Sequence, residues 1–340
     1  MTAPFDIAAV EAWMGAHVPG FRGPVTVAKF ATGQSNPTFK LTAASGAYVL
    51  RRKPPGQLLK SAHAVDREFR VQSALAQTDV PVARMYALCE DDAVIGSMFY
   101  VMEHVSGRTF VDPRLPDTTV EDRAMIFDDM NRVLAAIHAV CLNTTGLSDY
   151  GPQGNYYQRQ IDRWTKQYRA TETEALSEMD ALIDWLTRNL PEDDGRITLV
   201  HGDYRIDNLL FAPDRANCLA VLDWELSTLG HPFADLAAVI MQWGLPPGDV
   251  GRGLAGVDRA TLGLPEDQAF IDAYCRRMNL PGIDQFGFYL AFTYFRMASI
   301  LQGVKRRAMD GNASNPEKAL ELGAYVPAFA KGGLLAAKSV

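Results

Sequence analysis

The chain has 340 residues, enough for two lobes or domains, and 48% of them are hydrophobic, which suits a packed core rather than a disordered chain. Aspartate and glutamate outnumber lysine and arginine by 40 to 33, for a formal net charge of -7, which argues against a nucleic-acid binder held by bulk positive charge. Any anionic ligand must therefore be held by a local group of basic residues.

The cysteine and hydrophobicity patterns favour a protein of the reducing cytoplasm. The four cysteines lie far apart with no CxxC pair, so neither a zinc ribbon nor a disulfide framework is indicated. The N-terminal stretch has acidic residues where a signal peptide would have lysine or arginine, and no apolar run reaches the roughly 18 residues of a membrane span. We expect no membrane span and no nucleic-acid partner.

The first hundred residues are expected to form a small sheet with one helix. Alternating apolar and polar residues predict an antiparallel meander of three strands, and two further strands follow it. The expected strands are 25–30, 38–43, 47–52, 83–91 and 97–105. Apolar residues at three-to-four spacing predict a helix over 61–77, after the breaker KPPG.

Beyond Gly107 helical periods dominate, as in 126–137 and 176–190. Only two short strand-like runs are expected there, ITLVHGD (197–203) and CLAVLDWE (218–225). The sequence therefore predicts an α+β fold, with a small antiparallel sheet plus helix in a first lobe, residues 1–104, and a mainly helical second lobe, residues 105–340.

Polar residues gather at the ends of the two short strands of the helical lobe. Asp203, Asn208, Asp223 and Glu225 supply carboxylate and amide oxygens with no cysteine or paired histidine nearby, and such hard oxygen ligands are preferred by magnesium. Taken singly, each residue is as well explained as the cap of a turn. As a set in this order, they favour a metal site.

An aspartate directly after a buried strand, with an asparagine five residues later, is the arrangement in which protein kinases place a catalytic base and a metal-binding amide. Asp203 would then orient and deprotonate a hydroxyl. In the first lobe, Gly33 lies in a loop between strands that would let backbone N–H groups approach phosphates, Arg51 follows on a third strand, and Glu68 lies on the next helix. The order of loop, cation and helical acid favours a nucleotide site.

The chain resembles the aminoglycoside phosphotransferase family, a branch of the bilobal protein-kinase-like fold, and more narrowly the kinase-like domain of acyl-CoA dehydrogenase family members ten and eleven. The resemblance rests on stretches between about residues 30 and 305. They are VLRRKPPGQLLKSAHAVDREFRV, FYVMEHVSGR, RQIDRWTKQY, HGDYRIDNLLF and VLDWELSTLGHPFADLA.

The resemblance implies an ATP-dependent phosphotransferase that uses Mg²⁺, and it implies a role for each matching residue. Asp203 would be the catalytic base, and Asn208 and Asp223 would be magnesium ligands, joined by Glu225 where many relatives have a second aspartate. Gly33, Ser35 and Asn36 would cover the phosphates, Arg51 and Glu68 would form the cation–acid pair, and the main chain at Glu103 and Val105 would hydrogen-bond adenine. His201 and Asp235 would support the catalytic loop.

This sequence departs from the family pattern at two points. Arg51 replaces the lysine of protein kinases, and Arg52 and Lys53 follow it, so the cation that contacts phosphate is open among the three. No dehydrogenase domain follows, so we expect any coupling to fatty-acid oxidation to involve a separate acyl-CoA dehydrogenase.

The acceptor is indicated mainly by resemblance, since relatives of the subgroup are associated with hydroxyacyl-CoA thioesters. On the predicted helix containing RQIDRWTKQY, Arg159, Arg163 and Lys166 fall on one face beside Trp164 and Tyr168 and would hold the phosphates and adenine of coenzyme A. An equally open interpretation is a solvated face above an aromatic core contact. Amino sugars, choline-like compounds and other small alcohols are alternative acceptors. A metal-dependent phosphoesterase and a non-catalytic nucleotide-binding module are alternative functions.

Overall fold

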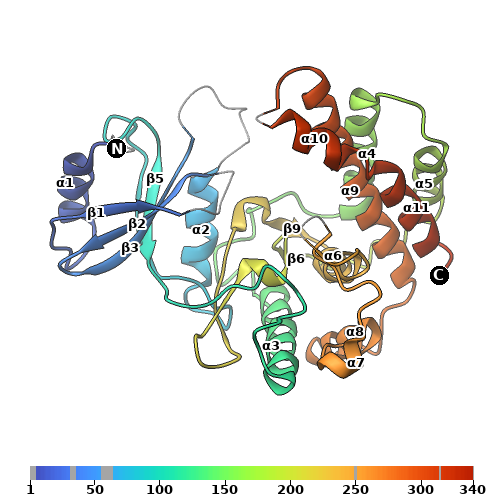
Figure 1. The fold of residues 1–340 in the computed structure, drawn as a ribbon, viewed down its shortest axis with the longest axis horizontal. Helices are drawn as coiled ribbons and strands as arrows, with labels where there is room; N and C mark the ends of the chain where they lie inside the picture. Colours follow the sequence, from blue (N-terminus) through green and yellow to red (C-terminus); the bar gives the residue numbers. More distant parts are fainter. Residues whose placement is uncertain (1–4, 31–35, 55–63, 249–250, 314, 340) are drawn as a thin grey trace. The chain divides into compact units, whose positions relative to one another are not determined.

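A computed structural model describes residues 5–30, 36–54, 64–248, 251–313 and 315–339 (Figure 1). The chain divides into two compact units, each built from three separate stretches of the sequence. The first unit comprises Met1–Phe110, Val140–Ser148 and Arg205–Ser227, and the second comprises Val111–Ala139, Asp149–Tyr204 and Thr228–Val340. The chain thus passes from the second unit to the first between Tyr204 and Arg205, inside the predicted catalytic loop.

The first unit contains a five-stranded antiparallel sheet in the order β1-β2-β3-β5-β4. Its strands are β1 (Thr26–Lys29), β2 (Thr38–Ala43), β3 (Gly46–Arg52), β4 (Met85–Cys89) and β5 (Phe99–Glu103). All five correspond to predicted strands. The predicted helix is α2 (Val65–Leu75), and residues 61–63 of the expected range lie outside the described residues. The helix α1 (Ile7–His17) was not predicted, although Asp6 caps its N-terminus by accepting from the Ala9 N–H.

Each face of this sheet packs against its own helix, because successive side chains of a strand point to opposite faces. On one face Leu50, Phe99 and Val101 form an apolar core with Val10 and Met14 of α1, and Figure 1 shows this helix beside the sheet. On the other face α2 packs against β4 and β5. The second face bears Arg51 of β3, which pairs with Glu68 of α2.

The first unit also contains a short two-stranded sheet of β7 (Leu209–Phe211) and β8 (Cys218–Val221). A short 3-10 helix, η1 (Ile206–Asn208), precedes β7, and another, η2 (Trp224–Leu226), follows β8. Gly107 lies against this sheet so closely that a Cβ on it would meet the Phe211 carbonyl oxygen at 2.5 Å. Arg108 and Phe211 exchange two backbone hydrogen bonds at this point.

The second unit is mainly helical, with one two-stranded sheet of β6 (Thr198–Val200) and β9 (Thr228–Gly230). Its helices are α3 (Val120–His138), α4 (Tyr156–Thr171), α5 (Ser177–Arg188), α6 (Phe233–Trp243), α7 (Arg259–Leu262), α8 (Asp267–Arg277), α9 (Phe286–Met309), α10 (Pro316–Gly323) and α11 (Val326–Ala336). The long helix α9 contacts α4, α5, α6, α10 and α11 (Figure 1). It buries aromatic residues along most of its length.

Beyond residue 107 the prediction of only two short strands was wrong, because the described residues contain four. The missed strands β7 and β9 have three residues each, which is too short for an alternation to be recognised. In the described part of the chain no helix is long and apolar enough to cross a membrane.

Candidate active site

In the first unit one guanidinium group lies among three carboxylates. Arg51 Nε of β3 lies 2.8 Å from Glu68 Oε2 of α2, and Arg51 Nη2 lies 2.7 Å from Asp223 Oδ1 and 3.7 Å from Glu225 Oε2. The carboxylates outweigh the effect of burial and raise the pKa of Arg51. The structure therefore brings together the predicted cation, its helical partner and two predicted metal ligands, although Arg51 and Asp223 are 172 residues apart in the chain.

The structure also distinguishes the three consecutive cations, because neighbours on a strand point to opposite faces. Arg51 points to the α2 face. Arg52 points away from it, and its guanidinium donates to the Ser97 hydroxyl and the Ile95 carbonyl, both at 3.0 Å. Lys53 lies beyond the strand, 3.8 Å from Asp66. Of the three cations, Arg51 is the one that lies at the carboxylates.

Buried polar groups fix Glu68 in this position. Its carboxylate accepts hydrogen bonds from the Tyr100 hydroxyl at 3.1 Å and from the Asn36 amide at 2.7 Å. Burial, supported by the negative charges of Asp223 and Glu225 and opposed by Arg51, raises the pKa of Glu68 to about 7. The negative charges of Asp223 and Glu225 oppose ionisation of Glu68, and a bound divalent cation would reduce this repulsion.

Asn208 and Asp223 are held next to each other by the β7–β8 sheet. Leu209 pairs with Val221, and the Leu222 N–H donates to the Asn208 carbonyl at 2.8 Å. Asp223 adopts a left-handed conformation with φ 64°, which is uncommon for a residue other than glycine and often marks a functional site.

These residues suit a magnesium ion. Their donors are an amide and carboxylate oxygens, and the side chain of Asp223 is 37% exposed, so an ion can reach it. No group of three or more histidine, cysteine or acidic side chains among the described residues is arranged to enclose a metal. Magnesium needs no such group, because it commonly takes one or two protein carboxylates and completes its shell with water and phosphate.

The segment predicted to bind adenine begins at Glu103, the last residue of β5. The Glu103 N–H donates to the Arg84 carbonyl at 2.8 Å and so belongs to the sheet. Within the described residues, the main chain of Val105 makes no hydrogen bond, and its N–H and carbonyl are therefore available to a ligand.

Of the residues predicted to cover phosphates, Gly33 and Ser35 lie outside the described residues. Asn36 is fully buried, and its side-chain amide is bound to Glu68. Its side chain therefore supports the Arg51–Glu68 pair. A contact between Asn36 and the phosphates would have to come from its main chain.

In the second unit the Asp235 carboxylate holds the strand end that precedes Asp203. Its two oxygens accept from the N–H groups of His201 at 2.7 Å and Gly202 at 2.8 Å. The Asp203 N–H lies 3.3 Å from His201 Nδ1, which accepts it. Asp235 thus contacts the main chain that leads to the half-buried Asp203, and support of the catalytic loop by His201 and Asp235 stays a prediction.

Two residues not predicted from the sequence complete this support. His138 Nε2 lies 3.4 Å from Asp235 Oδ2, and His138 Nδ1 lies 2.7 Å from the Tyr274 hydroxyl. Burial by itself raises the pKa of Asp235, but hydrogen bonds from His138 and the Gly202 N–H outweigh it and hold that pKa below its ordinary value. The sequence signal was weak, since a lone histidine on a helix gives no indication of its partner.

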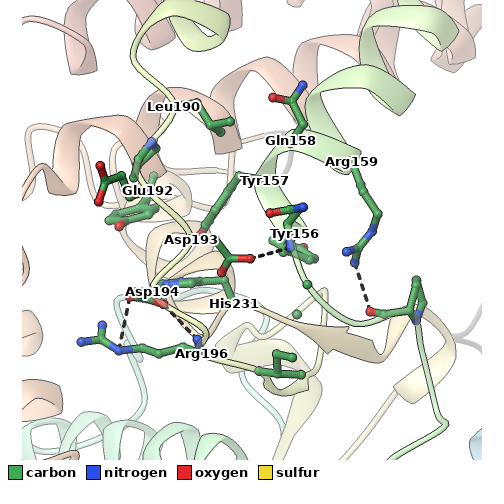
Figure 2. A pocket seen from close by; sticks show the side chains of 17 residues that line it. Tyr156, Tyr157, Gln158, Arg159, Leu190, Glu192, Asp193, Asp194, Arg196 and His231 are labelled. Atoms are coloured by element: carbon green, nitrogen blue, oxygen red, sulfur yellow. Dashed lines mark hydrogen bonds and ion pairs between the residues drawn. The ribbon is translucent and has the colours of Figure 1, made fainter.

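A cavity of about 270 Å³ lies at the end of β6 and β9 remote from Asp203 (Figure 2). Tyr157 and Tyr289 line it, and so does His231, which stacks on Tyr289. Acidic residues at its rim are largely engaged already. Asp193 accepts from the Asn155 and Gly195 N–H groups, and Asp194 lies 3.3 Å from His231 and 3.4 Å from Arg196.

The predicted basic face is present on α4. Arg159 is half-buried, whereas Arg163 and Lys166 are exposed. Trp164 and Tyr168 belong to the buried face of the same helix. The helix is therefore compatible both with a binding face for coenzyme A and with a solvated face above an aromatic core contact.

Comparisons with known proteins show the family of this chain. Residues 26–278 match the model of the phosphotransferase enzyme family. The chain is 48% identical over 294 residues to acyl-CoA dehydrogenase family member 10 of Mus musculus, covering 86% of this chain and 27% of that protein. It is 42% identical over 340 residues to family member 11 of Rattus norvegicus, covering 97% of this chain and 43% of that protein. The chain thus spans less than half the length of these relatives.

Solved structures show the same fold. A Ralstonia eutropha protein provisionally titled an aminoglycoside phosphotransferase has 50% identity and a TM-score of 0.91, covering 98% of this chain and 99% of that one. An aminoglycoside phosphotransferase in ternary complex with ADP and hygromycin B has 15% identity and a TM-score of 0.64, covering 96% and 98%. The predicted α+β, protein-kinase-like fold is confirmed by these likenesses.

Proposed function

Because the chain belongs to the phosphotransferase enzyme family, we propose that it transfers the γ-phosphate of magnesium-bound ATP to a hydroxyl group of a small molecule. The main support is the cluster in which Arg51 contacts Glu68 and Asp223. A cation on the third strand, paired with a helical acid and placed beside a metal-binding aspartate, is the arrangement that protein kinases use to hold ATP phosphates.

The first unit would bind the nucleotide. Asn208 and Asp223, assisted by Glu225, would hold magnesium, which supplies charge neutralisation on the phosphates when it is bound. Arg51 would exchange part of its contact with the carboxylates for phosphate oxygens. The free main chain of Val105 would hydrogen-bond adenine. We propose residues 1–104 as the nucleotide-binding lobe and residues 105–340 as the lobe with the catalytic loop, the metal site and the acceptor pocket.

Asp203 would act on the acceptor. As the acceptor oxygen forms a bond to the γ-phosphorus, the bond from that phosphorus to the bridging oxygen breaks, ADP leaves, and Asp203 takes the hydroxyl proton. Asp235 contributes by fixing the main chain at His201 and Gly202, since proton transfer requires a base within hydrogen-bond reach of the hydroxyl.

For the acceptor we propose a hydroxyacyl-CoA or a hydroxy acid. Two observations support this choice. The curated relatives carry the name acyl-CoA dehydrogenase family members 10 and 11. For the same reason we propose a separate acyl-CoA dehydrogenase as a partner. In addition, the acidic rim of the cavity in Figure 2 is largely neutralised, since Asp194 is paired and Asp193 closes turns of the backbone. Such a rim is poorly suited to a ligand with several ammonium groups.

A second candidate acceptor is an amino sugar or another small alcohol. It is favoured by the fold shared with an aminoglycoside phosphotransferase crystallised with hygromycin B and by Glu192 at the cavity rim.

The test is a turnover screen with magnesium-ATP over hydroxyacyl-CoAs, free hydroxy acids, amino sugars, choline and small alcohols, with detection of both ADP and the phosphorylated product. We expect phosphorylated hydroxyacyl-CoA or hydroxy acid and no product from Asp203→Asn. Release of inorganic phosphate without any phosphorylated acceptor would indicate a phosphoesterase instead. Nucleotide binding without turnover of any compound would indicate a binding module.

A further inference from the structure

We propose that Arg163 and Arg296 form a binding site for an anionic group of the acceptor, a carboxylate or a phosphate ester, beside the catalytic loop. This inference rests on the proposed phosphotransfer, and it adds the charge of the acceptor and the residues that recognise it. Sequence reasoning did not find Arg296, which lies 132 residues beyond Trp164 on a different helix.

Both arginines lie against the same indole ring. The guanidinium carbon of Arg163 is 5.3 Å from the ring centroid of Trp164, and that of Arg296 is 6.0 Å from it. Trp164 is 9% exposed, and its Nε1–H donates to Gln160 at 3.1 Å, so the ring is fixed. A fixed aromatic face orients a guanidinium while leaving most of its N–H donors free for a ligand.

Arg296 connects this pair to the reacting loop. Its Nη2 donates to the Gly202 carbonyl at 3.2 Å, and Gly202 directly precedes Asp203. The Gly202 N–H is itself bound to Asp235, so both the N–H and the carbonyl of Gly202 are hydrogen-bonded. A guanidinium has five N–H donors, and this contact uses one of the five in Arg296.

The arginines of this site make no direct ion pair among the described residues. Among the described residues no carboxylate lies within ion-pair distance of Arg159, Arg163 or Arg296. Arg159 donates instead to the carbonyls of Pro152 and Gln153 at 3.1 and 2.9 Å.

The charges of the three arginines all affect Tyr156. Burial has the largest effect on this group and raises the pKa of Tyr156. The charges of Arg296, Arg159 and Arg163 act against burial, and the charge of Asp235 acts with it. Tyr156 also packs against Gly230, where a Cβ would meet its ring at 2.6 Å, and it lines the cavity of Figure 2 with Arg159. Arg296 at the catalytic loop and Arg159 at the cavity therefore both act on Tyr156.

An anion is the ligand that this arrangement fits. Like charges repel in the absence of a counterion, whereas a carboxylate or phosphate ester can accept paired N–H groups from a guanidinium fork. An ammonium group would be repelled. The nucleotide is assigned its own cation in the first unit, Arg51, so the anion is attributed to the acceptor.

The experiment compares Arg163→Met and Arg296→Gln with the wild type, using a 4-hydroxy acid, its uncharged methyl ester and its CoA thioester. We expect each variant to weaken binding of the acid and the thioester by about tenfold to a hundredfold, the scale of one charge-assisted hydrogen bond. Binding of the ester and the Michaelis constant for ATP should not change. An effect on the thioester but not on the acid would assign the site to coenzyme A phosphates.

Arg188→Met on α5 is the matched control, because Arg188 is 76% exposed and pairs only with Asp184 on its own helix. Arg163→Met does not alter the contact with Gly202, so it tests the site even if Arg296→Gln disturbs the loop.

Binding measured by calorimetry makes the result independent of turnover. Equal affinity of both the acid and the thioester for the wild type and for both variants would overturn the anion site, even if the enzyme phosphorylates hydroxyl groups. Absence of turnover with every acceptor would overturn the proposed function instead.

Discussion

Replacing Asp235 by asparagine should be among the most damaging conservative changes in this protein. The carboxylate is 1% exposed and accepts two backbone N–H groups, at 2.7 and 2.8 Å, and contacts His138 Nε2 at 3.4 Å. In Asp235→Asn one oxygen becomes an NH₂ group that cannot accept, so one buried N–H loses its partner. An unsatisfied buried donor costs about 1–3 kcal/mol, and weakening the charge-assisted bonds adds to this.

We therefore expect the free energy of unfolding to fall by about 2–4 kcal/mol, a large share of the roughly 5–15 kcal/mol of a typical domain. Urea titration followed by circular dichroism measures this change. Asp184→Asn is the matched control, since the side chain of Asp184 is 67% exposed in its pair with Arg188, and such pairs contribute about 0–1 kcal/mol. A loss below about 0.5 kcal/mol in Asp235→Asn would refute the assigned role of this carboxylate.

The pH dependence of this variant gives an independent check. The folded pKa of Asp235 lies below its ordinary value, so the stabilising contribution of the carboxylate is complete above the unfolded pKa of about 3.9 and is lost as the pH falls through the folded pKa. The difference in unfolding free energy between wild type and Asp235→Asn should be constant between about pH 6 and 8 and should narrow below about pH 4. A difference that grows on acidification would contradict this.

Three further predictions concern the reaction and the packing. Asp203→Asn should leave ATP affinity nearly unchanged but lower turnover by roughly a hundredfold or more, the scale of a lost general base, and unchanged turnover in a steady-state assay would contradict the assignment. Asp223→Ala should abolish magnesium-dependent nucleotide binding in calorimetry, and normal binding would count against it as a metal ligand. Gly107→Ala should destabilise by about 1–3 kcal/mol, because its Cβ would meet the Phe211 carbonyl oxygen at 2.5 Å. Gly15→Ala, with nothing within 4 Å in helix α1, should stabilise by up to about 1 kcal/mol in the same thermal or urea melts, and equal effects of the two glycine changes would show that close packing is not the cause.

Local patterns in the sequence were sufficient for the first sheet and its helix. The strands alternate apolar and polar residues, and α2 repeats its apolar residues with helical period, so each element carries its own signal. The helix α1 has a local signal as well, with an aspartate cap followed by apolar residues at Val10 and Met14. The three-residue strands β7 and β9 are different, because three residues do not establish a period.

The order of residues along the chain by itself determined the candidate chemistry: an aspartate after a buried strand, an asparagine five residues later, and a second aspartate after the next strand. That order is a local property of the sequence. The partners of these residues are not. Arg51 pairs with Asp223, which is 172 residues away in the chain. In the same way, hydrogen bonds join distant residues in the pairs Asn36–Glu68, His138–Asp235 and Arg296–Gly202. Only the tertiary structure decided these contacts, because packing of distant elements determines which buried polar groups must satisfy one another.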